Sequence, residues 1–95
     1  MNHLVLTANI AEISAQRYTP AGIPAIDLTL EHESELAEAG QMRKVKVSVR
    51  SIAIGPMAEV IRKQAIGSEH KFTGFLGSTR NAKGILFHIQ AFEPI

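Results

Sequence analysis

The chain has 95 residues, of which 45% are hydrophobic and 20% charged, as expected of one globular domain spanning residues 1–95. It contains no cysteine, which excludes a disulfide framework and a thiolate metal site and favours a reducing compartment. No apolar run approaches the ~20 residues needed to cross a bilayer, and the first residues do not follow the pattern of a secretion signal. We therefore expect a cytoplasmic protein.

The net charge of +1 conceals an uneven distribution of charge. Four of the nine acidic residues lie within eight positions: Glu31, Glu33, Glu35 and Glu38. The rest of the chain carries ten basic and five acidic residues. Because a ligand responds to the local field, a basic face and an acidic segment are both compatible with this small total.

The first part of the chain predicts two strands separated by a loop. Residues 4–13 alternate apolar and polar side chains, which is typical of a strand with one buried face. Two prolines and a glycine within residues 18–24 predict a loop. Residues 25–32 alternate again and predict a second strand. Its inward side chains are Ile26, Leu28 and Leu30.

A third strand, from Arg43 to about Ile54, carries the main functional signal. One face is apolar and is predicted to point into the core: Val45, Val47 and Val49. The other face is mostly basic: Lys44, Lys46, Ser48 and Arg50. Alternate side chains of a strand lie about 7 Å apart, close to the phosphate spacing of a single nucleic-acid strand, so this face is predicted to track a polyanion. The alternative is a solvated edge strand whose lysines prevent aggregation.

The remaining segments predict one helix and two more strands. Residues 33–41 are acidic and tolerate a helix, which predicts a long connection between the second and third strands. Pro56 opens a helix to about Ile66, with Met57, Val60 and Ile61 inward and Gly67 as its cap. Residues 69–76 and 85–92 predict the last strands, joined by a polar turn, and Gly74 marks a bulge.

This order of elements predicts an all-β (mostly) protein, a five-stranded OB-fold Greek-key barrel with one helix between strands three and four. In such a barrel the ligand face is formed by strands two and three and the neighbouring loops. The basic row of strand three and the turn with Arg80 and Lys83 would then lie on the same side.

Several short motifs, taken in order, resemble one known family. They are Pro20-Ala21-Gly22-Ile23-Pro24, Leu30-Glu31-His32-Glu33-Ser34, Glu38-Ala39-Gly40, Gly67-Ser68 and Gly74-Phe75. Together they resemble the PriB family, the primosomal replication proteins N of bacteria, over residues 4–93. The resemblance implies a homodimeric OB-fold protein that binds single-stranded DNA at replication forks within the nucleoid. It also implies contacts with the restart helicase and the helicase-loader protein.

The resemblance also assigns residues to these roles. Arg17 matches a basic position near the end of the family's first strand, and Arg80 and Lys83 match lysines of its last turn. Members carry an aromatic residue near the start of strand three, where this chain has Met42 and Lys46. Because each stacked base contributes about 1–3 kcal/mol, we expect weaker DNA binding that relies more on charge.

We therefore predict two sets of functional residues. The DNA-binding set is Arg17, Tyr18, Arg43, Lys44, Lys46, Arg50, Arg80 and Lys83. The dimer interface, implied by the pairing of first strands in related proteins, is Leu4, Val5, Leu6, Thr7 and Ala8. Tyr18 either stacks on a base or caps the end of the barrel. The alternative for the lysines is cross-strand pairing with Asp27 and Glu31.

Neither a cofactor nor enzymatic activity is expected. The three histidines within predicted elements lie on three segments, without the spacing of a metal site: His32, His70 and His88. The serines lack a nucleophile context, and no glycine-rich loop opens the helix. Two other functions remain open, an OB-fold protein–protein adaptor whose basic face docks on an acidic partner, and an RNA-binding module.

Overall fold

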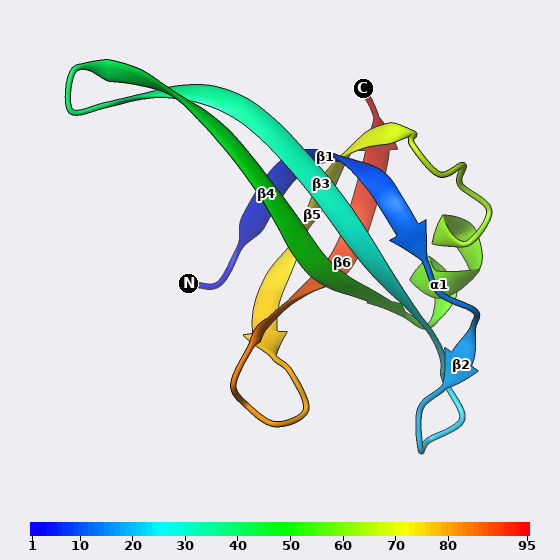
Figure 1. Ribbon diagram of the computed structural model, residues 1–95. Coiled ribbons are helices and arrows are strands. Elements are labelled where there is room, and N and C mark those ends of the chain that lie inside the picture. Colours follow the sequence, from blue (N-terminus) through cyan, green and yellow to red (C-terminus); the bar gives the residue numbers. More distant parts are fainter.

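Five long strands close into a barrel in the computed structural model, which describes residues 1–95 (Figure 1). They are β1 (Leu4–Ile13), β3 (Pro24–Glu38), β4 (Gln41–Ile54), β5 (Glu69–Ser78) and β6 (Ile85–Pro94). A two-residue strand, β2 (Arg17–Tyr18), and a short helix, α1 (Pro56–Ile61), complete the secondary structure. The predicted mostly-β barrel is confirmed, with the helix between the third and fourth long strands. No helix has the length and apolar character that a membrane span requires.

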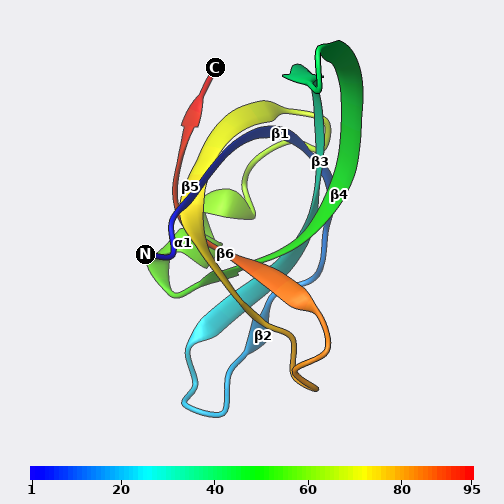
Figure 2. The ribbon, with the colours of Figure 1, turned by 90° about the vertical axis from the view of Figure 1, so that its left-hand side faces the viewer.

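The barrel closes because β1 pairs with two different strands. Its residues Leu4–Asn9 pair antiparallel with β5, and Asn9–Ile13 pair antiparallel with β3. The register with β3 shifts between Ile10 and Glu12, and such an irregularity lets a strand bend from one sheet into another (Figure 2). On the far side of the barrel, β4 meets β6 in parallel over two residue pairs. These pairs are Ser51–Phe87 and Ile52–His88.

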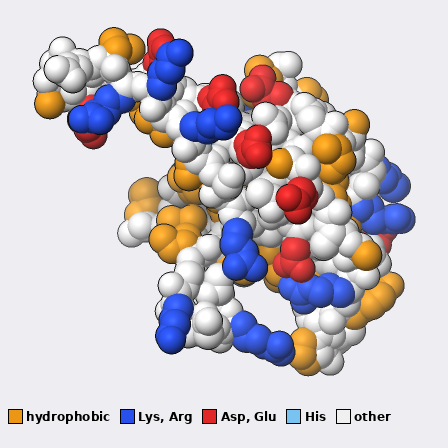
Figure 3. All heavy atoms as spheres, in the orientation of Figure 1, with side chains coloured by type: hydrophobic (Ala, Val, Ile, Leu, Met, Phe, Trp, Pro, Cys, Tyr) orange, Lys and Arg blue, Asp and Glu red, His pale blue; other side chains and the backbone are white.

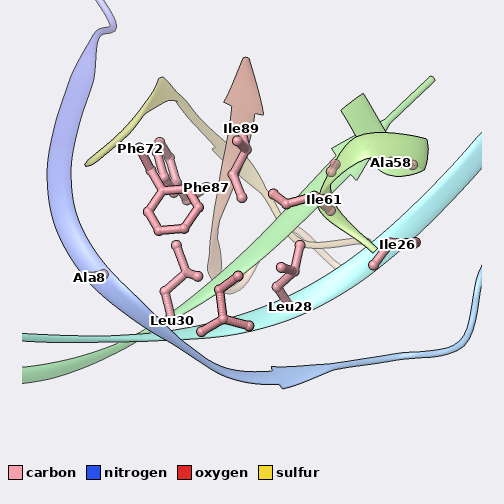
Figure 4. Close-up of a cluster of buried hydrophobic side chains, with 11 residues drawn as sticks. Ala8, Ile26, Leu28, Leu30, Ala58, Ile61, Phe72, Phe87 and Ile89 are labelled. Carbon is pink, nitrogen blue, oxygen red and sulfur yellow. The ribbon is translucent and has the colours of Figure 1, made fainter. Parts of the chain in front are cut away.

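The core lies between the strands and α1 (Figure 4). The three side chains predicted to point inward from the second strand are all buried: Ile26, Leu28 and Leu30. They pack with Phe72 and Phe87, which are fully buried. Gly74 is required at its position, because a Cβ atom there would collide with the carbonyl oxygen of His88. The register of β5 and β6 shifts at this residue, as the predicted bulge implies.

Residues 33–41 form a hairpin and not the predicted long connection. β3 continues to Glu38, β4 begins at Gln41, and the two residues pair with each other. Ala39 and Gly40 have φ values of 52° and 79°, and two consecutive positive values are typical of a type I′ turn. We call residues 32–47 the arm, which projects beyond the barrel in Figure 1.

The arm also corrects the prediction for the valines of strand three. Val49 lies at the base of the arm and packs against the core. Val47 is 43% exposed and Val45 is half-buried, because the strand has left the barrel at these positions. Their face is therefore the continuation of the core face, but it has no core to cover.

Two further segments differ from the predictions. The helix ends at Ile61 instead of Ile66, and the chain continues in turns, in which the N–H of Gln64 donates to the carbonyl of Ile61 (3.1 Å). Beyond these turns, Gly67 donates a hydrogen bond to the carbonyl of Ile10 (2.7 Å). Val60, predicted to face inward, is exposed, and Ala58 takes the buried position. The predicted loop at residues 18–24 is shorter, because β2 pairs with the first residues of β3.

Candidate nucleic-acid interface

A cleft on the surface brings together two of the predicted DNA-binding arginines. It is lined by Arg50 of β4 and by Thr79, Arg80 and Asn81 of the β5–β6 turn. A second hollow continues from Arg50 toward Asp27 and the end of β1. In Figure 3, Lys and Arg side chains gather around a hollow in the lower part of the molecule. The two segments that supply the arginines are far apart in the sequence and meet because β4 pairs with β6.

The β5–β6 turn that carries Arg80 and Lys83 is held by its own hydrogen bonds. The backbone N–H of Thr79 donates to the carbonyl of Gly84 (3.0 Å), and the N–H of Gly84 donates to the Thr79 hydroxyl (2.9 Å). The side chain of Asn81 accepts a hydrogen bond from the N–H of Lys83 (3.2 Å). The turn therefore presents its two cations from a defined backbone.

Arg17 does not line this cleft, but it is paired with Asp27, which lines the second hollow. Its guanidinium donates two hydrogen bonds to Asp27, at 2.8 and 3.1 Å. These bonds, and to a lesser degree the charge of Asp27, raise the pKa of Arg17 above its usual value. Ser14 fixes the backbone of Asp27 through two hydrogen bonds, at 3.0 and 2.9 Å. Arg17 is thus linked to the second hollow but partly neutralised.

Tyr18, the neighbour of Arg17 on β2, does not cap the barrel. It is 64% exposed, and its hydroxyl accepts a hydrogen bond from the side chain of Gln16 (3.1 Å). The prediction of a barrel cap is wrong because β2 lies outside the closed ring of five strands. Base stacking, the other role considered for Tyr18, stays a prediction.

The lysines of strand three lie on the arm, opposite acidic residues that the sequence placed in a loop. Lys46 pairs with Glu33 at 3.5 Å, and Lys44 lies opposite Glu35 in the register. Both lysines share the outer face of the arm. The alternative partners considered from the sequence, Asp27 and Glu31, are not the ones used, because the register of the hairpin sets the pairs. Such exposed pairs contribute roughly 0–1 kcal/mol each, but they cancel charge locally.

Arg43 is separated from the other predicted DNA-binding residues. It lies on the inner face of the arm, opposite Leu36, and forms a 2.6 Å ion pair with Glu38 near the tip. The arm therefore carries three cations and three acids and has no net charge. The structure brings Arg50 and Arg80 together at one cleft and links Arg17, through Asp27, to the adjoining hollow. It leaves the remaining strand-three cations on the arm.

Two aromatic side chains on the surface, Phe75 and His88, are not indicated by the sequence analysis. The rings of Phe75 and His88 stack on each other with centroids 4.6 Å apart on the outside of β5 and β6. Phe72 and Phe75 are three positions apart in one strand, so they point to opposite faces, and this spacing was the available signal. Phe92 packs against the core, as expected for the phenylalanines.

The three histidines lie in separate surroundings. His32 contacts the carbonyl of Thr7, His70 is buried between Phe72 and Phe92, and His88 stacks on Phe75. No group of three potential metal-ligating side chains occurs in the structure.

Comparison with known proteins identifies the family. The protein-family model described as "another single-strand binding protein family" matches residues 2–91 of the chain. Replication restart protein PriB of Bordetella pertussis is 40% identical, covering 100% of this chain and 90% of its own length. The homologous PriB of Nitrosomonas europaea is 31% identical, over 94% of this chain and 83% of its own.

Solved structures show the same barrel. The structure of PriB from Ralstonia solanacearum superposes with a TM-score of 0.89 at 35% identity, covering 99% of this chain and 97% of that one. The single-stranded DNA-binding protein from Thermus aquaticus superposes with a TM-score of 0.78 at 24% identity, over 100% of this chain and 50% of that one, which shows a shared OB fold. The chain therefore belongs to the replication restart protein PriB family, within the single-strand binding proteins.

Proposed function

We propose that this protein binds single-stranded DNA as an accessory component of the replication-restart primosome. The observation that carries the proposal is the cleft between Arg50 and Arg80, in a chain that belongs to the PriB family. Two arginines on different strands can each hold a phosphate of one backbone, and guanidinium groups suit phosphate geometry. The protein acts by binding and not by catalysis.

The proposed DNA path begins at the cleft. Arg50, Arg80 and Lys83 contact the phosphates first, because none of them forms an ion pair within the protein. Arg17 contributes where a phosphate can share it with Asp27, and Tyr18 offers an exposed ring to a base. Lys44 and Lys46 extend the path along the outer face of the arm with less effect, because the facing glutamates reduce their field.

A salt series tests this proposal directly. Fluorescence anisotropy of a labelled oligothymidine should show binding whose log affinity falls linearly with log salt, at about −0.7 per phosphate neutralised on a single strand. Three to five phosphate contacts correspond to a slope of roughly −2 to −3.5. An affinity that does not change with salt would contradict phosphate binding, and no binding at low salt would contradict the proposed function itself.

The assembly and location of the protein complete the proposal. It forms a single OB-fold domain over residues 1–95 with Greek-key connections, and it works as a homodimer joined through Leu4–Ala8 of β1. Along these residues β1 pairs only with β5, and no strand lies along its second edge, where the Thr7 carbonyl contacts the His32 side chain. The dimer contacts the restart helicase and the helicase loader in the cytoplasm, at forks within the nucleoid.

A second candidate is a protein–protein adaptor with marginal DNA binding. The observation that favours it is the neutral arm, whose lysines face glutamates and which carries no Phe, Tyr or Trp. In that case an acidic protein surface, and not DNA, occupies the cleft of Arg50 and Arg80. Failure of oligothymidine to bind, with retained binding to a primosomal partner protein, would support the adaptor.

A further inference from the structure

The arm lacks the support that a two-stranded ribbon needs. The protein measures 50 × 30 × 21 Å along its principal axes, and the arm extends beyond the barrel as two paired strands with no third (Figure 1). An isolated two-stranded hairpin is at best marginally stable in water, and packing of one face is what stabilises such a ribbon. One face of the arm should therefore be covered in the working protein.

The two faces of the arm differ in the way that identifies the covered one. The outer face holds the exposed ladder of Glu33, Glu35, Lys44 and Lys46. The inner face continues the core-facing side of the barrel, from the pair Leu30–Val49 to Val47, Val45 and Leu36. Leu36 is 58% exposed and Val47 is 43% exposed. His32 and Ser34 lie opposite the two valines, so the face is only partly apolar. Exposed apolar side chains that continue a core but meet no core favour a partner.

The inner face is turned toward the open edge of β1. His32 belongs to this face, and its Nδ1 lies 2.6 Å from the carbonyl oxygen of Thr7 in β1. Over Leu4–Ala8 the second edge of β1 has no strand beside it, and Val5 is 49% exposed. A strand edge with no neighbouring strand, bonded at Thr7 to the His32 side chain, and a partly apolar face therefore adjoin each other at the base of the arm.

A second copy of the chain satisfies both features at once. The sequence Leu4-Val5-Leu6-Thr7-Ala8 has no charge, so the strand can pair antiparallel with itself without bringing like charges together. Antiparallel pairing of identical strands generates a two-fold axis. Because the inner face of each arm adjoins its own β1 at Thr7, a partner strand added along that edge would lie next to the same face. A different partner would have to supply a strand and an apolar face together.

We propose that the inner face of the arm packs on the β1 strand of the partner protomer, so that each protomer contributes one such contact to the dimer. This inference rests on the proposed homodimer and adds a contact to it. It assigns Leu36, Val45 and Val47 to the dimer interface, and it places Arg43 and Glu38 at its rim instead of on the DNA path. The outer face, with Lys44 and Lys46, remains open to DNA.

Neighbouring residues on opposite faces of the arm provide a matched test. The variant Leu36→Asp with Val47→Asp alters the inner face, and Ala37→Asp with Ser48→Asp alters the outer face of the same strands by the same charge. Sedimentation velocity over a concentration series should show a dimer dissociation constant raised about 100-fold or more for the inner variant, as expected when a buried apolar contact is lost. The outer variant should stay within about threefold of the unmodified protein.

The absence of cysteine allows a second test that does not depend on a destabilising substitution. Chains carrying only Val47→Cys are mixed with chains carrying only Val5→Cys and treated with a short bismaleimide. Because each chain has one thiol, a link between the two kinds of chain reports an arm on a partner's β1. Ser48→Cys, on the outer face, should link to Val5→Cys at least tenfold less.

The outcomes separate this inference from the homodimer on which it rests. A monomeric unmodified protein at micromolar concentration would remove the homodimer and the arm contact together. A stable dimer with equal dissociation constants for the inner and outer variants, and no Val47–Val5 link, would overturn the arm contact alone. Loss of oligothymidine binding by the inner variant with its dimer intact would show that the inner face binds nucleic acid instead.

Discussion

The arginines of the candidate interface differ in whether they already form an ion pair within the protein. This difference determines how readily each can bind a phosphate. Arg17 donates from Nε and Nη2 to the two carboxylate oxygens of Asp27, whereas Arg50 and Arg80 form no ion pair in the protein. An unpaired cation at a cleft loses no internal partner when a phosphate arrives. Arginine is charged at every pH at which DNA binding is measured, and the hydrogen bonds to Asp27 raise the pKa of Arg17 further.

Arg80→Ala should weaken oligothymidine binding about three- to tenfold and make the salt slope shallower by roughly 0.7, the value of one phosphate contact. The reason is the loss of one unpaired cation from the cleft with Arg50. Anisotropy titrations at several salt concentrations measure both quantities. Lys63→Ala, on the segment after α1, serves as the control, and an equal effect of that variant would refute the cleft as the site.

Asp27→Asn should strengthen oligothymidine binding about two- to fivefold, because it removes a negative charge and frees Arg17 for a phosphate. The amide keeps the shape of the side chain, and the backbone hydrogen bonds with Ser14 are unaffected. The salt slope should become steeper by part of one contact. Weaker binding in this variant would mean that Asp27 serves mainly to hold Arg17 in place for DNA.

At the scale of elements, the arm shows how a strand pair forms outside a barrel. Its outer face is stabilised by cross-strand charge pairs, and its tip by the turn of Ala39 and Gly40. Ala39 adopts a φ of 52°, a region that favours glycine and asparagine over alanine. The turn thus retains a small amount of backbone strain at the end of the arm.

Ala39→Asn should stabilise the arm by roughly 0.5–1 kcal/mol, because Asn-Gly is the preferred pair for a type I′ turn. Native-state amide exchange of residues 32–47 is the suitable measurement, since the arm can open without the barrel unfolding. Exchange of the arm amides should slow several-fold, while the core amides of β5 stay unchanged. Faster exchange at the tip would contradict the assigned turn geometry.

The arm also shows where prediction from sequence reached its limit. Alternation predicted β1 over Leu4–Ile13 and the inward residues of β3, because each of these has one face on the core. Beyond Leu30 neither face of the hairpin meets the core, so residues 33–41 have no apolar period and resemble a loop. The partners of Lys44 and Lys46 depend on the register, which a two-residue turn sets and composition does not reveal.

The candidate site was predicted in part for the same reason. The sequence indicated Arg50 and Arg80 as cations near one ligand face, and both line one cleft. It did not separate them from Arg43, whose position on the inner face follows from its parity in β4. The ion pair of Arg17 with Asp27 does not follow from the sequence either, because no alternation marks Arg17–Tyr18 as a strand that pairs with β3.

At the scale of the whole molecule, the hydrophobic core is small, so one buried side chain contributes a large part of the free energy of unfolding. Phe72 is fully buried and contacts residues of several strands. Phe72→Ala should therefore lower the free energy of unfolding by about 3–5 kcal/mol, a large part of the total for a small domain. Urea denaturation followed by circular dichroism measures this loss. Phe75→Ala, on the outer surface, should cost much less, and equal losses would contradict the assignment of the two faces.

The parallel contact of β4 with β6 is the shortest junction between long strands of the barrel. All other neighbouring long strands share longer antiparallel ladders, whereas this junction consists of the pairs Ser51–Phe87 and Ile52–His88. Arg50 lies next to this junction in β4, and the turn with Arg80 leads into β6 on its other side. A nucleic-acid strand that binds both arginines should therefore stabilise the short β4–β6 junction against local opening. Binding should then protect the amides of β4 and β6 at this junction from exchange, even where the strand itself does not touch them.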